Sequence, residues 1–223
     1  MANFTTHFTV AAVGGALVGG LGWQAGLWPF VESFPIAGIV ALGGVVPDID
    51  ADQSRAVRLI FTLMAMLAVI GCVSALQPFL SLAELSGVGI GAYLFVRYPL
   101  SRLFKRFSVH RGIWHSLLAA VLSALVVASV SYHLFIQTAG QSWVLAGAML
   151  IGVLIHLLLD EIYSIDIEGR RLKRSFGTAF KLYDYGTPQT AMLMGIVMLS
   201  TIPWLPPYGV LQDLGHRIWA LWG

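Results

Sequence analysis

Long apolar runs separated by short polar connections fill most of the chain as far as residue 205. A helix needs about 20 mostly apolar residues to cross the hydrocarbon core of a bilayer. The pattern predicts seven hydrophobic segments, at 9–28, 36–47, 57–77, 85–97, 115–136, 143–160 and 189–205. We therefore expect an all-α fold of the polytopic integral membrane class.

Two of these segments, 36–47 and 85–97, are short and rich in glycine, with the stretches GIVALGGVV and GVGIGAYLFV. Glycine lets helices approach closely in lipid. Irregular backbone at membrane depth is tolerated only inside protein or beside water. We therefore expect both segments to be half-helices that are buried among their neighbours.

The last part of the chain, 206–223, contains YGVLQDLGHRIWALWG, where one helical face carries Leu211, Leu214, Ile218 and Trp222. This pattern is typical of an amphipathic helix in the membrane interface. A final helix that docks on the rest of the protein fits the pattern equally well. The chain has no internal repeat and no second soluble region, so we expect 1–223 to form a single membrane-embedded domain.

Composition supports the membrane class, because 57% of the 223 residues are hydrophobic and only 11% are charged. Soluble domains carry about a quarter charged residues. The formal charge of +2 is too small to indicate a nucleic-acid partner. The single cysteine, Cys72, excludes an intramolecular disulfide and suggests no thiol metal site. The opening MANFTTH holds no lysine or arginine, so we expect no cleavable signal peptide.

Basic residues are distributed unevenly between the connections. Twelve of the thirteen lysine and arginine residues follow the second, fourth and sixth segments, and Arg217 is the exception. The twelve are Arg55, Arg58, Arg97, Arg102, Lys105, Arg106, Arg111, Arg170, Arg171, Lys173, Arg174 and Lys181. Because basic loops stay in the cytoplasm, we expect a multi-pass protein of the inner (cytoplasmic) membrane, with its N-terminus inside and its C-terminus outside.

A histidine and an aspartate, His156 and Asp160, lie one helical turn apart in GVLIHLLLDEI, so both point the same way. A carboxylate at the bilayer centre costs about 3 kcal/mol on insertion scales. Asp160 lies at the cytoplasmic end of its segment, where the cost is lower. Taken alone, the pair fits either a metal site or an aspartate that reaches water beside an unrelated histidine.

Further histidines and aspartates share the predicted cytoplasmic face: His7 before the first segment, Asp48 and Asp50 after the second, and His110 and His115 at the start of the fifth. Pro47 turns the backbone before the two aspartates, and Gly112 can turn it between the two histidines. Singly, each group also fits a solvated turn. The predicted topology rests on lysine and arginine alone, and it places all seven of these histidines and aspartates at the cytoplasmic face. This independent agreement predicts a metal site. His133 and His216 fall on the other side, and we leave them out.

Imidazole and carboxylate groups together suit Zn, Mn or Fe better than Ca or Mg, and we favour Zn or Mn. Seven groups exceed the three or four ligands of one zinc ion. We expect either two ions bridged by a carboxylate, or one ion with polar partners around its ligands and a general base. Asp50 is the candidate for bridging the ions, for supporting their ligands or for catalysis. Arg111 is the candidate for binding a phosphate. The chain has no GxSxG, no phosphate-binding glycine loop and no HExxH, so those mechanisms have no support.

These motifs resemble those of the bacterial membrane-bound, metal-dependent hydrolases known as LexA-binding, inner membrane-associated hydrolases. The similarity extends to about Lys181 and rests on four motifs in order: a histidine near position 7, PDID, HRGxxHS from His110 to Ser116, and HxxxD. It implies a membrane-embedded hydrolase whose metal ligands are these positions. Many relatives continue with a Thr-Pro-Gly type loop, whereas this chain has EIYSIDIEGRRLKRSFGTAFKLYD, which indicates a subfamily. By looser analogy, the motif order is similar to that of zinc-dependent phospholipases C and related nucleases.

We expect the protein to cleave a phosphoester of a lipid or lipid-linked substrate with a metal-activated water, because the predicted site lies at the level of the lipid head groups. Membrane lipids and a lipid-linked phosphate are the expected partners, and a homodimer is conceivable. The alternative is a transporter or metal-ion carrier that uses the same histidines and aspartates, with the two short segments as broken helices. A third possibility is a scaffold in which the metal is purely structural.

Overall fold

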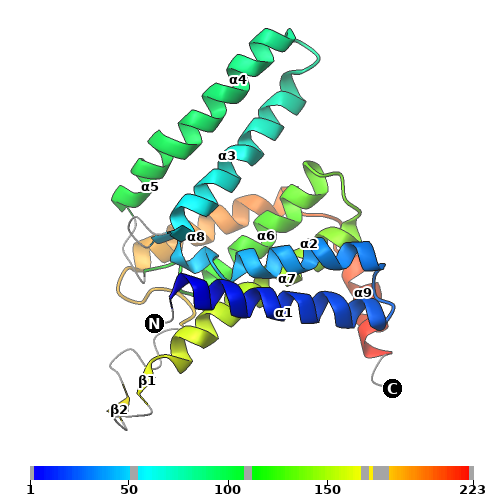
Figure 1. Cartoon of the computed structure of the whole chain (residues 1–223), viewed down its shortest axis with the longest axis vertical. Coiled ribbons are helices and arrows are strands. Elements are labelled where there is room, and N and C mark those ends of the chain that lie inside the picture. The colour runs from blue at the N-terminus through cyan, green and yellow to red at the C-terminus, as the bar shows by residue number, and fades with distance from the viewer. Residues whose placement is uncertain (1–2, 51–54, 108–111, 167–170, 173–180, 221–223) are drawn as a thin grey trace. The chain divides into compact units, whose positions relative to one another are not determined.

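The computed structural model describes residues 3–50, 55–107, 112–166, 171–172 and 181–220. These residues are almost all helical (Figure 1). Besides helices and their connections, the described residues include two short strands, β1 (Ile165–Asp166) and β2 (Arg171–Leu172), which pair antiparallel. The chain forms two compact units, one of Met1–Pro47 with Ile113–Gly223 and one of Asp48–Gly112.

The first unit is a helical assembly built around one long central helix. Its helices are α1 (Phe4–Gln24), α2 (Phe30–Gly43), α6 (Leu117–His133), α7 (Ala139–Ile162), α8 (Pro188–Thr201) and α9 (Val210–Trp219), with a short 3₁₀ turn η3 (Ile202–Trp204) before α9. Helix α7 packs against α1, α2 and α6 (Figure 1). Buried Met149, Val153 and Leu157 of α7 pack with Ala120 of α6. The face of α7 that carries His156 is therefore the face that the other helices cover.

The second unit is a helical hairpin of α3 (Arg55–Leu76) and α4 (Leu82–Phe95). Helix α4 continues through a π-helical turn, η2 (Val96–Leu100), into α5 (Ser101–Phe107), and Gly89 is its one buried residue. The segment 85–97 is therefore not the buried half-helix that we expected. Pro99 lies in this turn and lacks an N–H, and a wider π turn absorbs such a defect. The rings of Phe61 and Phe104, 5.5 Å apart, join α3 to α5.

Each of the seven predicted segments falls mostly on a helix, but the helices differ in length. Within the part of the chain that the structure describes, α1, α3 and α7 are long and apolar enough to cross a membrane. Helices α2 and α6 are apolar but shorter. Three candidate spans are therefore established, and crossing by α2, α4, α6 and α8 stays a prediction.

Helices α2 and α7 approach each other backbone to backbone. A Cβ atom built on Gly43 would lie 2.6 Å from the carbonyl oxygen of Met149, and one on Gly152 would overlap the carbonyl oxygen of Val40. Only glycine allows this approach, which is the role of small residues between membrane helices. The contact brings the end of α2 against the C-terminal half of α7.

Candidate metal centre

The C-terminal half of α7 presents His156 and Asp160 on the same face, as their spacing predicts. Both side chains are buried, with 0% and 2% of their surface exposed. Nε2 of His156 lies 3.8 Å from Oδ2 of Asp160. The aspartate therefore does not reach water at the helix end, which was the alternative explanation of this pair.

His7 reaches the same place from α1. Its ring stacks on that of His156 with centroids 3.8 Å apart and planes 13° from parallel. Its Nε2 lies 3.3 Å from Oδ1 of Asp160. Helix α1 begins directly after Asn3, whose side chain accepts a hydrogen bond from the N–H of Thr6, so His7 lies in its first turn. Its position is therefore set by where the helix starts.

His115 approaches from the start of α6. Its Nε2 lies 3.7 Å from Oδ2 of Asp160, and its ring meets that of His156 edge-on at 5.3 Å between centroids. The next residue, Ser116, is the N-cap of α6, and its hydroxyl accepts a hydrogen bond from the N–H of Ala119. The cap fixes where α6 begins and with it the backbone that carries His115.

A backbone carbonyl orients the central histidine. Nδ1 of His156 lies 2.9 Å from the carbonyl oxygen of Gly44, just beyond α2. A carbonyl only accepts hydrogen bonds, so Nδ1 carries the proton and Nε2, which faces Asp160, is the nitrogen with a lone pair. Metal-binding histidines are commonly oriented by such a bond. Sequence analysis missed this role of Gly44, although the glycine-rich stretch GGVVPDID was the available signal.

We call His7, His115, His156 and Asp160 the His/Asp cluster. Ligands about 2.1 Å from a tetrahedral ion lie roughly 3.4 Å apart, close to the 3.3–3.8 Å between imidazole nitrogens and Asp160 oxygens. Candidate ligand atoms of His7, His156 and Asp160 all lie within 4.8 Å of one another. Among the described residues, no ring nitrogen of His7 and no carboxylate oxygen of Asp160 makes a well-formed hydrogen bond. Buried polar atoms normally have partners, so the cluster fits a divalent cation.

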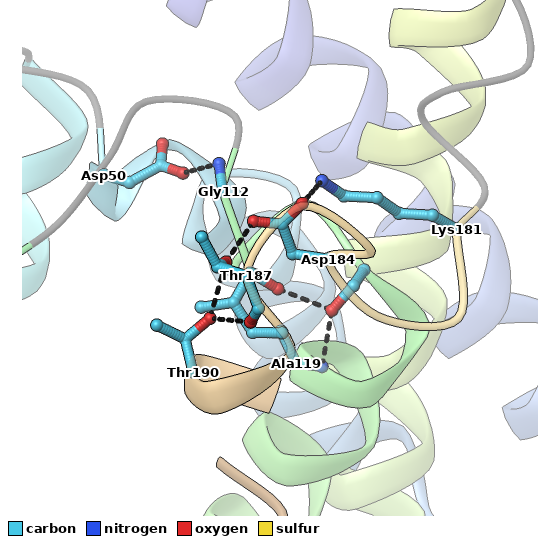
Figure 2. A network of polar contacts seen from close by, with 9 residues as sticks. Asp50, Gly112, Ala119, Lys181, Asp184, Thr187 and Thr190 are labelled. Atoms are coloured by element: carbon cyan, nitrogen blue, oxygen red, sulfur yellow. Dashed lines mark hydrogen bonds and ion pairs between the residues drawn. The ribbon is translucent and has the colours of Figure 1, made fainter. Parts of the chain in front are cut away.

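The remaining predicted residues have different outcomes. His110 and Arg111 lie outside the residues that the structure describes. Asp48 and Asp50 lie in a 3₁₀ turn, η1 (Val46–Asp50), which confirms the turned backbone after Pro47. In the second unit, Oδ2 of the buried Asp50 accepts a hydrogen bond of 3.2 Å from the Gly112 N–H (Figure 2). The bridging or catalytic role of Asp50 and the ligand role of Asp48 stay predictions.

The two histidines that we left out are accounted for separately. His133 lies at the end of α6, and its Nε2 is 2.9 Å from the carbonyl oxygen of Trp204. His216 lies exposed on α9. Neither belongs to the His/Asp cluster.

The connection before α8 supports the start of α6. The carbonyl oxygens of Lys181 and Leu182 accept hydrogen bonds from the first two N–H groups of α6, 3.0 Å each. Asp184 accepts from the Thr187 hydroxyl at 2.6 Å and lies 3.2 Å from the Lys181 ammonium (Figure 2). The Thr187 hydroxyl is the main cause that lowers the pKa of Asp184. From this connection we predicted only the charge of its basic residues and a departure that indicates a subfamily, because its structural role depends on backbone carbonyls.

Comparison with known proteins gives one match. A family model described as "YdjM inner membrane protein" matches residues 1–172, well over half of the chain and all four residues of the His/Asp cluster. Neither the curated proteins nor the solved structures give a match. The description of the matching family agrees with the predicted inner-membrane location and the apolar helices. It names no activity, so hydrolysis and LexA binding stay predictions.

Proposed function

The chain belongs to the YdjM inner membrane protein family, and we propose that it is a metal-dependent hydrolase that cleaves a phosphoester of a lipid or lipid-linked substrate at the cytoplasmic membrane face. One observation carries the proposal. Three imidazoles, from α1, from α7 and from the turn before α6, meet one carboxylate in a buried place, at distances that suit ligands of one ion. Such a set of groups is costly to bury without a cation.

In this proposal, His7, His156 and Asp160 hold a Zn or Mn ion, and His115 completes the set. A bound ion of this kind polarises a phosphoryl oxygen and acidifies water, which is the chemistry that phosphoester hydrolysis needs. The Gly44 carbonyl holds His156 with the lone pair of Nε2 toward Asp160, where it would be available to a bound ion. The helices that bury the cluster keep bulk water from the charged groups, which strengthens their electrostatic interaction.

The predicted topology supports a lipid-linked substrate. The cluster lies at the C-terminal end of α7, and the charge distribution assigns this end to the cytoplasmic face. Lipid head groups and lipid-linked phosphates are found at this depth. We propose that Arg111 binds the substrate phosphate and that Asp50 acts as general base or bridging ligand.

Metal content is the first test. We would purify the full chain in detergent, remove any affinity tag, load it with Zn or Mn, and measure bound metal by elemental mass spectrometry. We expect one or two equivalents in the wild type and loss of metal in a His156→Ala, Asp160→Ala double variant. A His133→Ala, Asp213→Ala double variant is the matched control. His133 at the end of α6 and Asp213 on α9 both lie outside the cluster, so this variant should keep its metal. Equal metal content in all three proteins would refute the proposed site.

An activity assay distinguishes the hydrolase from a metal-ion carrier and from a protein with a purely structural metal. The metal-loaded protein is assayed for phosphate release from lipid phosphomonoesters and for cleavage of phosphodiesters in mixed micelles. Hydrolysis that requires His156 supports the hydrolase. Uptake of metal into proteoliposomes that requires His156, without hydrolysis, would favour a carrier instead. Stoichiometric metal with neither activity would favour a structural role.

A further inference from the structure

A cavity with charged side chains in its wall lies at the opposite end of α7 from the His/Asp cluster. It has a volume of about 590 Å³, is open on one side, and is lined by the α1–α2 connection, the first turn of α7 and α9. Residues in its wall include Trp23, Trp28, Glu32, Gln141, Leu214 and Arg217. The proposed function uses none of them.

The cavity contains one cationic and one anionic side chain. Nη2 of Arg217 donates hydrogen bonds to the carbonyl oxygens of Gly26 and Leu27 at 2.9 and 3.2 Å, which fixes the guanidinium at the cavity. A guanidinium has five N–H donors, and these bonds use one nitrogen, so it can also bind an anionic oxygen. Oε1 of Glu32 accepts a hydrogen bond of 2.5 Å from Gln141, which holds the carboxylate in place. A ligand with both a phosphate and an ammonium group would satisfy both charges.

An apolar groove adjoins this cavity. A second hollow of about 390 Å³ shares Glu32, Gln141 and Val144 with the first, so the two adjoin at these residues. Its other lining residues are mainly apolar and include Pro35, Ile36 and Leu145. A cavity with charged side chains beside an apolar groove matches a head group with an attached acyl chain.

The depth of the cavity agrees with such a ligand. Gln141 and Asp160 are 19 residues apart on α7, which corresponds to about 28 Å at 1.5 Å per residue. This is close to the roughly 30 Å thickness of the hydrocarbon core. If the His/Asp cluster lies at one face of the membrane, the cavity lies at the other. Tryptophans such as Trp23 and Trp28 are enriched at that level.

We propose that this cavity binds one zwitterionic aminophospholipid, with its phosphate at Arg217, its ammonium at Glu32 and one acyl chain in the groove. The inference is independent of the hydrolase proposal, because it involves the opposite end of α7 and needs no metal. The bound lipid would tie α9 to the α1–α2 connection, two parts of the chain that Arg217 already joins.

Native mass spectrometry of the detergent-purified full chain tests the charge pattern. The probes are phosphatidylethanolamine and anionic phosphatidylglycerol with the same acyl chains. We expect the wild type to retain phosphatidylethanolamine at least about tenfold better, and Arg217→Gln and Glu32→Gln each to lose most of this preference. Arg102→Gln, which changes an exposed arginine of α5, is the control and should behave as the wild type. Equal retention of both lipids by the wild type would overturn the proposal.

A pair of glycine variants tests the cavity without changing a charge. Gly140 lines the cavity and Gly147 lies two turns further along α7, and a Cβ built on either meets nothing within 4 Å. Gly140→Phe should fill the cavity and abolish retention of phosphatidylethanolamine, whereas Gly147→Phe should retain it. Circular dichroism and size-exclusion profiles check that both fold. Unchanged lipid retention in a folded Gly140→Phe protein would contradict the site.

Discussion

Asp160 is the residue on which three histidines converge. Its Oδ1 faces His7, and its Oδ2 faces His115 and His156. The side chain is only 2% exposed, so bulk water does not solvate the carboxylate. A buried carboxylate needs opposite charge or hydrogen bonds to compensate its lost hydration. A cation shared with the imidazoles would supply that compensation, which makes Asp160 the most informative single position to change.

Asp160→Asn should separate metal binding from folding. Asparagine has nearly the same shape and can still hydrogen-bond to imidazole, so we expect a folded protein. A ligand present at about 100 times its Kd stabilises the state that binds it by about 2.7 kcal/mol. Zn or Mn should therefore raise the thermal unfolding temperature of the wild type and have no effect on Asp160→Asn, as followed by circular dichroism in detergent. The same metal-dependent rise in both proteins would argue against Asp160 as a ligand.

The sequence predicts which side chains form the cluster better than it predicts the backbone groups that orient them. The spacing of His156 and Asp160 requires only a helix, and the charge-derived topology was enough to bring His7 and His115 to the same face. The glycine-rich stretch around Gly44 indicates a close backbone approach, but it does not show which carbonyl meets His156. Its contact with His156 depends on how closely two helices pack, and that distance is decided by tertiary structure.

At the scale of elements, the close approach of α2 and α7 determines where Gly44 lies. A methyl group on Gly152 would overlap the carbonyl oxygen of Val40 and lie 2.8 Å from Cα of Gly43. We expect Gly152→Ala to destabilise the protein by about 1–3 kcal/mol through overpacking, and to weaken metal binding because His156 loses its orientation.

Gly147→Ala is the matched control, since its Cβ meets nothing within 4 Å on the same helix. Chemical unfolding and metal titration of the two variants check the prediction. If Gly152→Ala and Gly147→Ala have the same metal affinity, the close approach of α2 and α7 does not orient His156.

The N-cap of α6 has a similar role for His115. Ser116 is fully buried, and its hydroxyl caps the helix directly after that histidine. Removing an N-cap hydroxyl costs about 1 kcal/mol, so Ser116→Ala should lower stability by that amount and also reduce metal affinity. Ser129→Ala, which removes a hydroxyl bonded to Leu125 within the same helix, should change neither quantity. Thermal unfolding with and without Zn compares them, and an unchanged metal affinity in Ser116→Ala would refute the coupling.

Hydrophobic patterning predicted which parts of the chain are helices better than it predicted where helices end. The glycines in 85–97 led us to expect a short half-helix, yet α4 runs on through η2 into α5. A proline usually indicates the end of a helix, and here a π turn accommodates Pro99 and the helix continues. The carbonyls that cap α6 come from residues 181–182, a contact that no local pattern could indicate.

At the scale of the whole molecule, the charge distribution predicts which side of the membrane each connection faces. In a Cys72→Ala background, single cysteines at Gln77 and Tyr185 report on the connection after α3 and the one before α8. Both side chains are exposed. We expect a membrane-impermeant maleimide to label Gln77→Cys in intact cells, and Tyr185→Cys only after permeabilisation. The reverse labelling pattern would invert the predicted orientation and move the His/Asp cluster to the outer face.

The contact between His7 and Asp160 also constrains how the protein is made. About 150 residues of chain separate these two positions. At roughly 5–20 residues per second, the ribosome needs on the order of 10–30 s to synthesise that length. During this interval, α1 is in the nascent chain but its histidine has no partner on α7. A complete ligand set exists only after α7 has been synthesised and inserted, so metal loading would be a late step of biogenesis, and chains that terminate before Asp160 should emerge without metal.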